Sequence, residues 1–149
     1  NHQREIESLV KVLGLGAMIR LVGPLYGQNK LDAFAAADVF ILPSYSEGAP
    51  MVILDSLAAG VPVLTTKATP WESLIKYQCG WWVEPSVDGL VDALQSLSAL
   101  SSSQLKEMGI HGKELVRAQY LWSSQAQKTL DLYNWLLGNG AKPDFVVCD

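Results

Sequence analysis

One carboxylate, Glu47, stands where a run typical of a strand passes into a run typical of a helix, in ILPSYSEGAPMVILDSLAAGVPVLTT, residues 41–66. In parallel α/β sheets, ligands bind outside the carboxyl ends of the strands, where loops such as the one expected over 44–50 lead into helices. If residues 51–59 form a helix, the N–H groups of its first turn point into that crevice and carry about half a positive charge. These N–H groups belong to Met51, Val52 and Ile53. A phosphate or diphosphate is favoured at such a place.

The Glu47 carboxylate is expected beside this anion site, because a carboxylate inside it would repel phosphate. There it can accept hydrogen bonds from the hydroxyls of a sugar joined to the phosphate. Gly48 lets the backbone approach the ligand without a Cβ in the way, and Asp55, one helical turn after Met51, brings a second carboxylate within reach of a ribose. Glu47, Gly48 and the start of the helix thus predict a sugar-phosphate cradle. The same spacing also fits a solvated Glu47 and an Asp55 that faces water.

Short apolar and β-branched runs ended by turn residues predict the strands that position this cradle. Strands are expected at 18–23, 38–44, 61–66 and 80–84. Helices are expected over 5–15, 30–37, 51–60, 70–78, 87–100, 102–120 and 123–137. The alternation predicts an α/β fold, a Rossmann-like parallel sheet with helices on both faces. One domain is expected over 1–137, with an irregular tail over 138–149.

Three helix starts have a local cause in the sequence. Pro50 suits the first turn of a helix, because the N–H that proline lacks would be unpaired there. Pro70 is expected to open the next helix with Thr69 as its N-cap, and the serines at 101–103 are expected to cap a later one.

Composition excludes several classes of function. The net charge is −4 and the 11 Lys and Arg are scattered, so no basic patch for nucleic acid is expected. Cys79 and Cys148 lie far apart, and His2 and His111 are isolated. These four residues therefore predict neither a disulfide framework nor a metal site. No apolar run reaches the roughly 18 residues that span a bilayer, so a soluble, cytoplasmic protein is expected.

With these residues placed, ADVFILPSYSEGAPMVILDSLAAGVPVLTT, residues 37–66, resembles the signature of retaining glycosyltransferases of family four, which have the B-type fold. The matching residues are Ala37-Asp38, Pro43-Ser44, Glu47-Gly48, Gly60 and Pro62-Val63. The resemblance covers most of residues 10–137 and implies the C-terminal, donor-binding half of such an enzyme. It further implies transfer of a sugar, with retention, from a UDP- or GDP-linked donor and without a cofactor.

The resemblance also assigns roles to individual positions. Glu47 would be the catalytic contact to hydroxyls of the transferred sugar, and Asp55 would hold the nucleotide ribose. Gly23, Pro24 and Leu25 would lie near the base. The sugar and diphosphate would be held by the backbone of Gly48, Ala49, Pro50, Met51 and Val52. Lys67, in the loop after the third expected strand, is interpreted as a solvated lysine that could alternatively help a phosphate.

Two departures from the family pattern limit what is expected of this chain alone. The family usually has Glu where Asp55 stands, which puts nucleotide affinity in doubt. Residues 1–17 match nothing in the opening strand–helix–strand segment of the family's donor half, which bears an Arg and a Lys for the diphosphate. The chain is therefore expected to be a fragment of a longer parent and inactive by itself, with the acceptor bound by an N-terminal half that is missing.

Partners and alternatives follow from these expectations. An edge left unpaired by the missing strands predicts a homodimer or a swapped assembly. The resemblance suggests a surface polysaccharide or lipopolysaccharide precursor as the acceptor, and a parent protein peripheral at the inner membrane. Two other functions remain open: a nucleotide-sugar epimerase of the same fold, which would want a catalytic His or acid pair, and a non-catalytic α/β interaction module.

Overall fold

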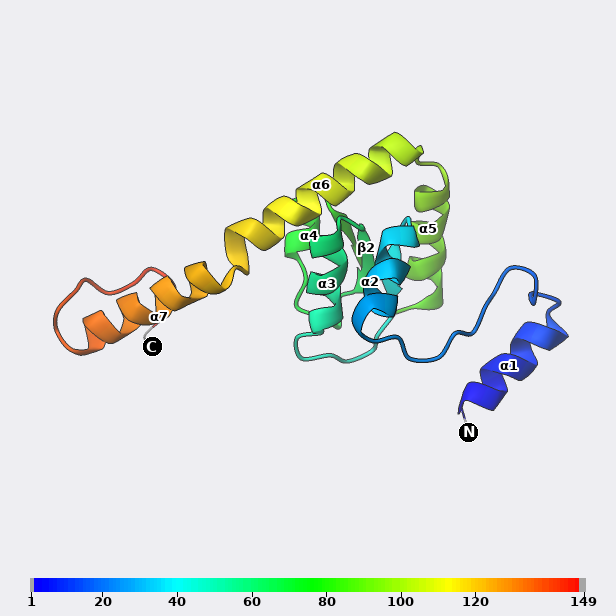
Figure 1. Cartoon of the computed structure of the whole chain (residues 1–149), viewed down its shortest axis with the longest axis horizontal. Coiled ribbons are helices and arrows are strands. Elements are labelled where there is room, and N and C mark those ends of the chain that lie inside the picture. The colour runs from blue at the N-terminus through cyan, green and yellow to red at the C-terminus, as the bar shows by residue number, and fades with distance from the viewer. Residues whose placement is uncertain (1, 148–149) are drawn as a thin grey trace. The chain divides into compact units, whose positions relative to one another are not determined.

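The computed structural model describes residues 2–147 of the chain. The chain divides into two compact units, residues 1–33 and residues 34–149. The first unit contains α1 (His2–Val12), which has no buried residue, and most of α2 (Gly27–Ala36), whose end reaches into the second unit. The remaining elements belong to the second unit (Figure 1). The limits of 1–137 and 138–149 expected from the sequence stay a prediction.

The strand expected over 18–23 is not formed, and residues 19–26 have no regular secondary structure. Gly23 has a φ of +68°, in the left-handed region that strands do not use, and Pro24 has no N–H to give to a neighbouring strand. An apolar run becomes a strand only where a partner takes its backbone hydrogen bonds. The prediction of a fourth strand was therefore wrong for the described residues.

The sheet of the second unit is parallel and has the order β1-β2-β3. Its strands are β1 (Phe40–Leu42), β2 (Val63–Thr66) and β3 (Gly80–Val83). Every residue of the central strand β2 is buried, which explains its unbroken apolar and threonine sequence. These three strands fall within the ranges expected from the sequence, and the α/β class with a parallel sheet is confirmed.

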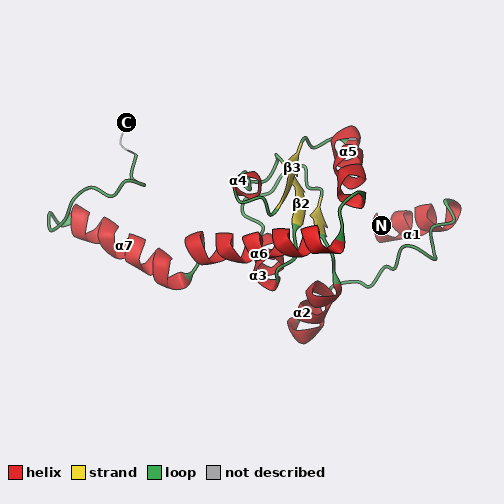
Figure 2. Cartoon of the chain, turned by 90° about the horizontal axis from the view of Figure 1, so that it is seen from above, coloured by secondary structure: helices red, strands yellow, loops and turns green. Residues whose placement is uncertain are grey.

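Helices flank this sheet. They are α3 (Met51–Ala59), α4 (Ser73–Lys76), α5 (Val87–Ser98) and α6 (Ser102–Gln119). The last helix, α7 (Trp122–Leu136), follows α6 and extends away from the sheet (Figure 1). Figure 2 shows α3 and α6 together on one side of the yellow strands. The core cluster of the unit joins α3 and α6 to the strands and to α4 through Ile53, Leu57, Val63, Leu74 and Leu115.

The helix starts agree only partly with the sequence. Ser101 caps α6 in a complete capping box with Gln104, as expected. Thr69 does not cap a helix, because its hydroxyl donates to the carbonyl oxygen of Thr66 at 2.9 Å and α4 begins later, at Ser73. Pro50 is the N-cap of α3 rather than a residue of its first turn.

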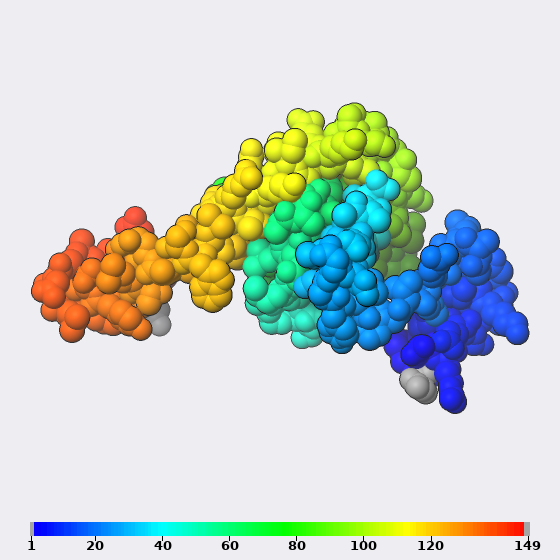
Figure 3. All heavy atoms as spheres, viewed as in Figure 1, coloured from blue at the N-terminus to red at the C-terminus, as the bar shows by residue number. Residues whose placement is uncertain are grey.

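Two glycines let α6 lie close against α3 (Figure 3, yellow against green). A Cβ added at Gly109 would lie 2.0 Å from the carbonyl oxygen of Gly60, which follows α3 as its C-cap. A Cβ added at Gly112 would lie 3.0 Å from Cδ2 of Leu57. The backbones therefore approach to a distance at which one added carbon atom collides.

Cys79 is part of the core, with no exposed surface. Burial raises the pKa of its thiol to about 12, because the thiolate would lose its hydration there. The thiol is accordingly protonated at neutral pH and packs as a small apolar group. Cys148 lies outside the described residues.

Candidate functional site

The loop from β1 to α3 is hydrogen-bonded to the end of β2 and to the segment that follows it. Thr65 donates its hydroxyl to the carbonyl oxygen of Leu42 at 2.9 Å, and Thr66 donates to that of Ser44. The N–H of Glu47 donates to the carbonyl oxygen of Ala68 at 3.3 Å. Both threonine side chains are buried, so the first part of the loop, up to Ser44, is attached to the interior of the unit.

Glu47 is exposed, and its carboxylate has one hydrogen-bond partner within residues 2–147. The hydroxyl of Ser44 donates to Oε1 of Glu47 at 3.0 Å. The other carboxylate oxygen, Oε2, is left able to accept. Sequence reasoning did not identify Ser44 as this partner, although the S-x-x-E spacing was visible.

A row of backbone N–H groups lies next to this carboxylate in sequence. Among the described residues, no acceptor takes the N–H groups of Gly48, Ala49, Met51 and Val52. Pro50, between them, has no N–H, and its φ of −67° and ψ of 103° turn the chain from the loop into α3. The N–H of Ile53 is not free, because it donates to the carbonyl oxygen of Pro50 at 3.1 Å. The expected N-terminal donors are thus Met51 and Val52, and Ile53 was predicted wrongly.

Gly48 has no structural need to be glycine. Its φ is not positive, and a Cβ added to it would meet no atom within 4 Å. Glycine is otherwise required where φ is positive or where neighbouring protein atoms approach closely. Gly48 therefore borders open space in which an added side chain meets no protein atom.

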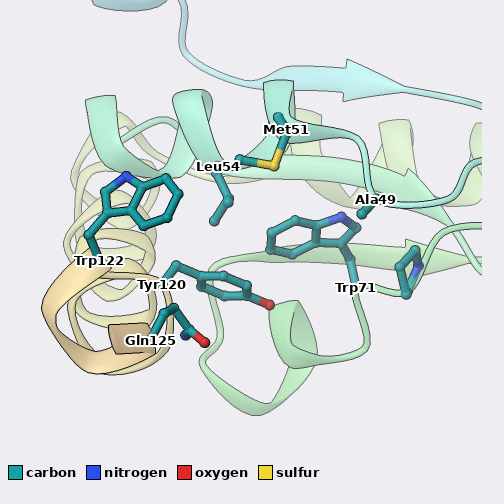
Figure 4. A pocket seen from close by; sticks show the side chains of 8 residues that line it. Ala49, Met51, Leu54, Trp71, Tyr120, Trp122 and Gln125 are labelled. Carbon is teal, nitrogen blue, oxygen red and sulfur yellow. The ribbon is translucent and has the colours of Figure 1, made fainter. Parts of the chain in front are cut away.

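Ala49 and Met51 also line an apolar cavity of about 290 Å³. Figure 4 shows Met51 and Leu54 projecting from α3 toward Trp71 and Tyr120, with Trp122 and Gln125 at the side. The rings of Trp71 and Tyr120 are 5.3 Å apart between centroids. Sequence reasoning missed this cavity, because its walls come from segments far apart in the chain.

Lys67, the residue after β2, interacts with two residues at the end of the neighbouring strand β3. Its Nζ lies 2.5 Å from Oε1 of Glu84 and 6.0 Å from the ring centroid of Trp82. The described residues contain no cluster of three or more His, Cys, Asp or Glu able to hold a metal ion. Nor does any helix within residues 2–147 have the length and apolarity needed to cross a membrane.

The family model for Glycosyl transferases group 1 matches residues 1–114. The chain belongs to this family. An uncharacterized glycosyltransferase of Methanocaldococcus jannaschii is 28% identical over 131 residues, covering 86% of this chain and 33% of the relative. The lipopolysaccharide glucosyltransferase WaaG of Escherichia coli is 38% identical over 64 residues, 42% of this chain and 16% of the relative.

Solved structures of similar proteins show the same fold. Sucrose-phosphate synthase from Thermosynechococcus elongatus superposes with a TM-score of 0.76 and 27% identity, covering 92% of this chain and 35% of that one. The structure of WaaG superposes with a TM-score of 0.66 and 28% identity, covering 87% and 35%. The chain thus has the fold of part of a B-type glycosyltransferase. Several curated relatives match most of this chain, and the chain spans about a third of the length of each of them.

Within this group 1 domain, the structure places the residues predicted from the sequence as follows. Glu47 to Pro50 lie in the loop after the carboxyl end of β1, and Met51 and Val52 begin α3. Their roles in the cradle stay predictions. Asp55 lies on α3 and is half-buried. Gly23, Pro24 and Leu25 belong to the first unit, so the site built from the second unit does not contain them, and their place near the base stays a prediction.

Proposed function

We propose that this chain is the donor-binding part of a glycosyltransferase that moves a sugar from a nucleotide-diphosphate sugar to an acceptor, with retention. The proposal is carried by one observation: an exposed carboxylate, Glu47, beside four backbone N–H groups that have no acceptor within the described residues. The N–H groups suit the diphosphate, and the carboxylate suits the sugar hydroxyls. Membership of the group 1 family supports the same assignment.

The chemistry proposed for this site is positioning and charge stabilisation. As the bond between the sugar and the nucleotide diphosphate breaks, negative charge develops on the diphosphate. Fixed N–H donors at the start of α3 oppose that charge without reorganising. Glu47 holds the sugar by its hydroxyls, and Asp55 is assigned the ribose of a UDP- or GDP-linked donor. The acceptor is proposed to be a surface polysaccharide or lipopolysaccharide precursor, and the relative WaaG, a lipopolysaccharide glucosyltransferase, supports the second of these.

The experiment that tests the proposal is a calorimetric titration of the chain with UDP, UDP-glucose, GDP and GDP-mannose. We expect saturable binding of one nucleotide series. Gly48→Ala should weaken that binding, because the new Cβ fills the ligand's space, and should leave the thermal midpoint unchanged, because it meets no protein atom within 4 Å.

Gly16→Ala is the matched control for this substitution. Gly16 also has no positive φ and nothing within 4 Å of an added Cβ, and it lies outside the cradle. Neither binding nor stability should change in this variant. Absence of binding by the unmodified chain at millimolar concentrations of all four ligands would contradict the proposed function.

A homodimer through β1 is part of the same proposal. β1 pairs with β2 only, among the described residues, so its other edge presents unpaired backbone groups. With three residues this edge is short, and we expect weak, concentration-dependent association in light scattering. Ile41→Lys should suppress it, since edge lysines oppose strand pairing. A monomer at all concentrations up to about the millimolar range would contradict the dimer.

A further inference from the structure

The Glu47 side chain carries several rotatable bonds and is exposed, so nothing in its packing fixes the direction of its carboxylate. A flexible Glu side chain loses rotamer freedom when it is held by a ligand, and that loss opposes binding. Whatever aims the carboxylate before the sugar arrives reduces this cost. Within residues 2–147 the only group in a position to do so is the hydroxyl of Ser44, 3.0 Å from Oε1.

Ser44 is itself fixed to the interior of the unit. Its N–H donates to the carbonyl oxygen of Leu42 at 3.0 Å, and its carbonyl oxygen accepts from the hydroxyl of Thr66. Thr66 is 1% exposed. The carbonyl oxygen of Thr66 accepts from both the N–H and the hydroxyl of Thr69, at 3.0 and 2.9 Å. A chain of hydrogen bonds therefore leads from the buried end of β2 to the exposed carboxylate.

We infer that Ser44 is a positioning residue for sugar recognition: anchored by Thr66, it holds Oε1 of Glu47 and leaves Oε2 aimed at a hydroxyl of the transferred sugar. The inference rests on the proposed function and adds a residue that does not itself touch the donor. Its specific consequence is that Ser44 affects the sugar and not the nucleotide. A side chain that only stabilised the loop would affect both, because the same loop supplies the N–H donors for the diphosphate.

The test measures the affinities of Ser44 variants for UDP and UDP-glucose, or for GDP and GDP-mannose if the guanosine series binds. Ser44→Ala should weaken binding of the nucleotide sugar by about tenfold, the scale of one lost hydrogen bond to a charged group. It should leave binding of the nucleotide diphosphate unchanged. Ser44→Thr retains the hydroxyl and should restore most of the sugar affinity.

Ser46→Ala is the matched control, because Ser46 lies in the same exposed loop and makes no hydrogen bond among the described residues. It should bind both ligands as the unmodified chain does. A double-mutant cycle adds the decisive comparison: in a Glu47→Ala background, Ser44→Ala should have no further effect, since its action passes through the missing carboxylate.

The outcomes separate this inference from the function on which it rests. If the unmodified chain binds and Glu47→Ala loses the sugar preference while Ser44→Ala keeps it, the positioning role is wrong and the proposed function stands. If Ser44→Ala weakens the nucleotide diphosphate equally, or acts additively with Glu47→Ala, Ser44 is a loop stabiliser and the inference is likewise overturned. If no nucleotide or nucleotide sugar binds the unmodified chain, both the positioning role of Ser44 and the proposed function are contradicted.

Discussion

Replacing Glu47 by alanine is expected to weaken binding of a nucleotide sugar by about ten- to a hundredfold while leaving the nucleotide diphosphate bound as well or slightly better. The loss corresponds to one hydrogen bond from a sugar hydroxyl to a charged acceptor, worth about 1.5–3 kcal/mol. The diphosphate is spared because its donors are the N–H groups that follow Glu47, and removing a negative charge beside an anion site favours the anion. Paired titrations with the diphosphate and its sugar conjugate measure the difference.

Glu107→Ala provides the control for the change in net charge. Glu107 is exposed on α6, has no partner among the described residues, and is not part of the loop. It should alter neither affinity. Glu47→Gln retains one carbonyl acceptor and should show an intermediate loss. Equal weakening of the diphosphate and of the sugar conjugate by Glu47→Ala would show that the carboxylate holds the loop together rather than the sugar.

Replacing Gly109 by alanine is expected to destabilise the second unit by about 3 kcal/mol or more. The added Cβ would lie 2.0 Å from a backbone oxygen, that of Gly60, which cannot rotate away as a side chain can. Helix α6 must then move away from α3, and the contacts of Leu57 and Leu115 in the core loosen with it. The higher helix propensity of alanine relative to glycine offsets only about 1 kcal/mol of this destabilisation. Urea unfolding followed by circular dichroism measures the net change.

Gly112→Ala is the comparison that isolates the backbone clash. It occupies the same face of α6, but its added Cβ meets the end of the Leu57 side chain at 3.0 Å, which can shift. We therefore expect a much smaller loss than at Gly109, within about 1 kcal/mol of the unmodified chain because the better helix preference offsets part of the strain. Equal effects at the two positions would mean that α3 and α6 do not meet at Gly60.

Much of the fold could be read from local patterns. Residues 63–66 and 80–83 are strands because short apolar runs between turn residues have few alternatives inside an α/β unit. The start of α6 was predictable because Ser101 and Gln104 satisfy the capping box with atoms only three residues apart. The prediction of a strand over 18–23 was wrong because a strand needs a neighbouring strand for its backbone hydrogen bonds, and no local pattern shows whether one is present. The predicted start of α4 was wrong because the hydroxyl of Thr69 donates to the carbonyl oxygen of Thr66 instead of capping the helix.

The sequence by itself determined that the acid, the glycine and the helix start proposed as the cradle follow β1, because they adjoin that strand in one short stretch. Residues 37–66 also matched enough of the family signature to predict the glycosyltransferase family. Only the tertiary structure decided that Thr66 anchors Ser44, that Gly48 borders open space, and that Trp71 and Tyr120 meet beside Met51. The physical reason is range: turns and caps depend on residues a few positions apart. Hydrogen bonds from buried Thr66 and the contact of Gly109 with Gly60 join segments that only packing brings together.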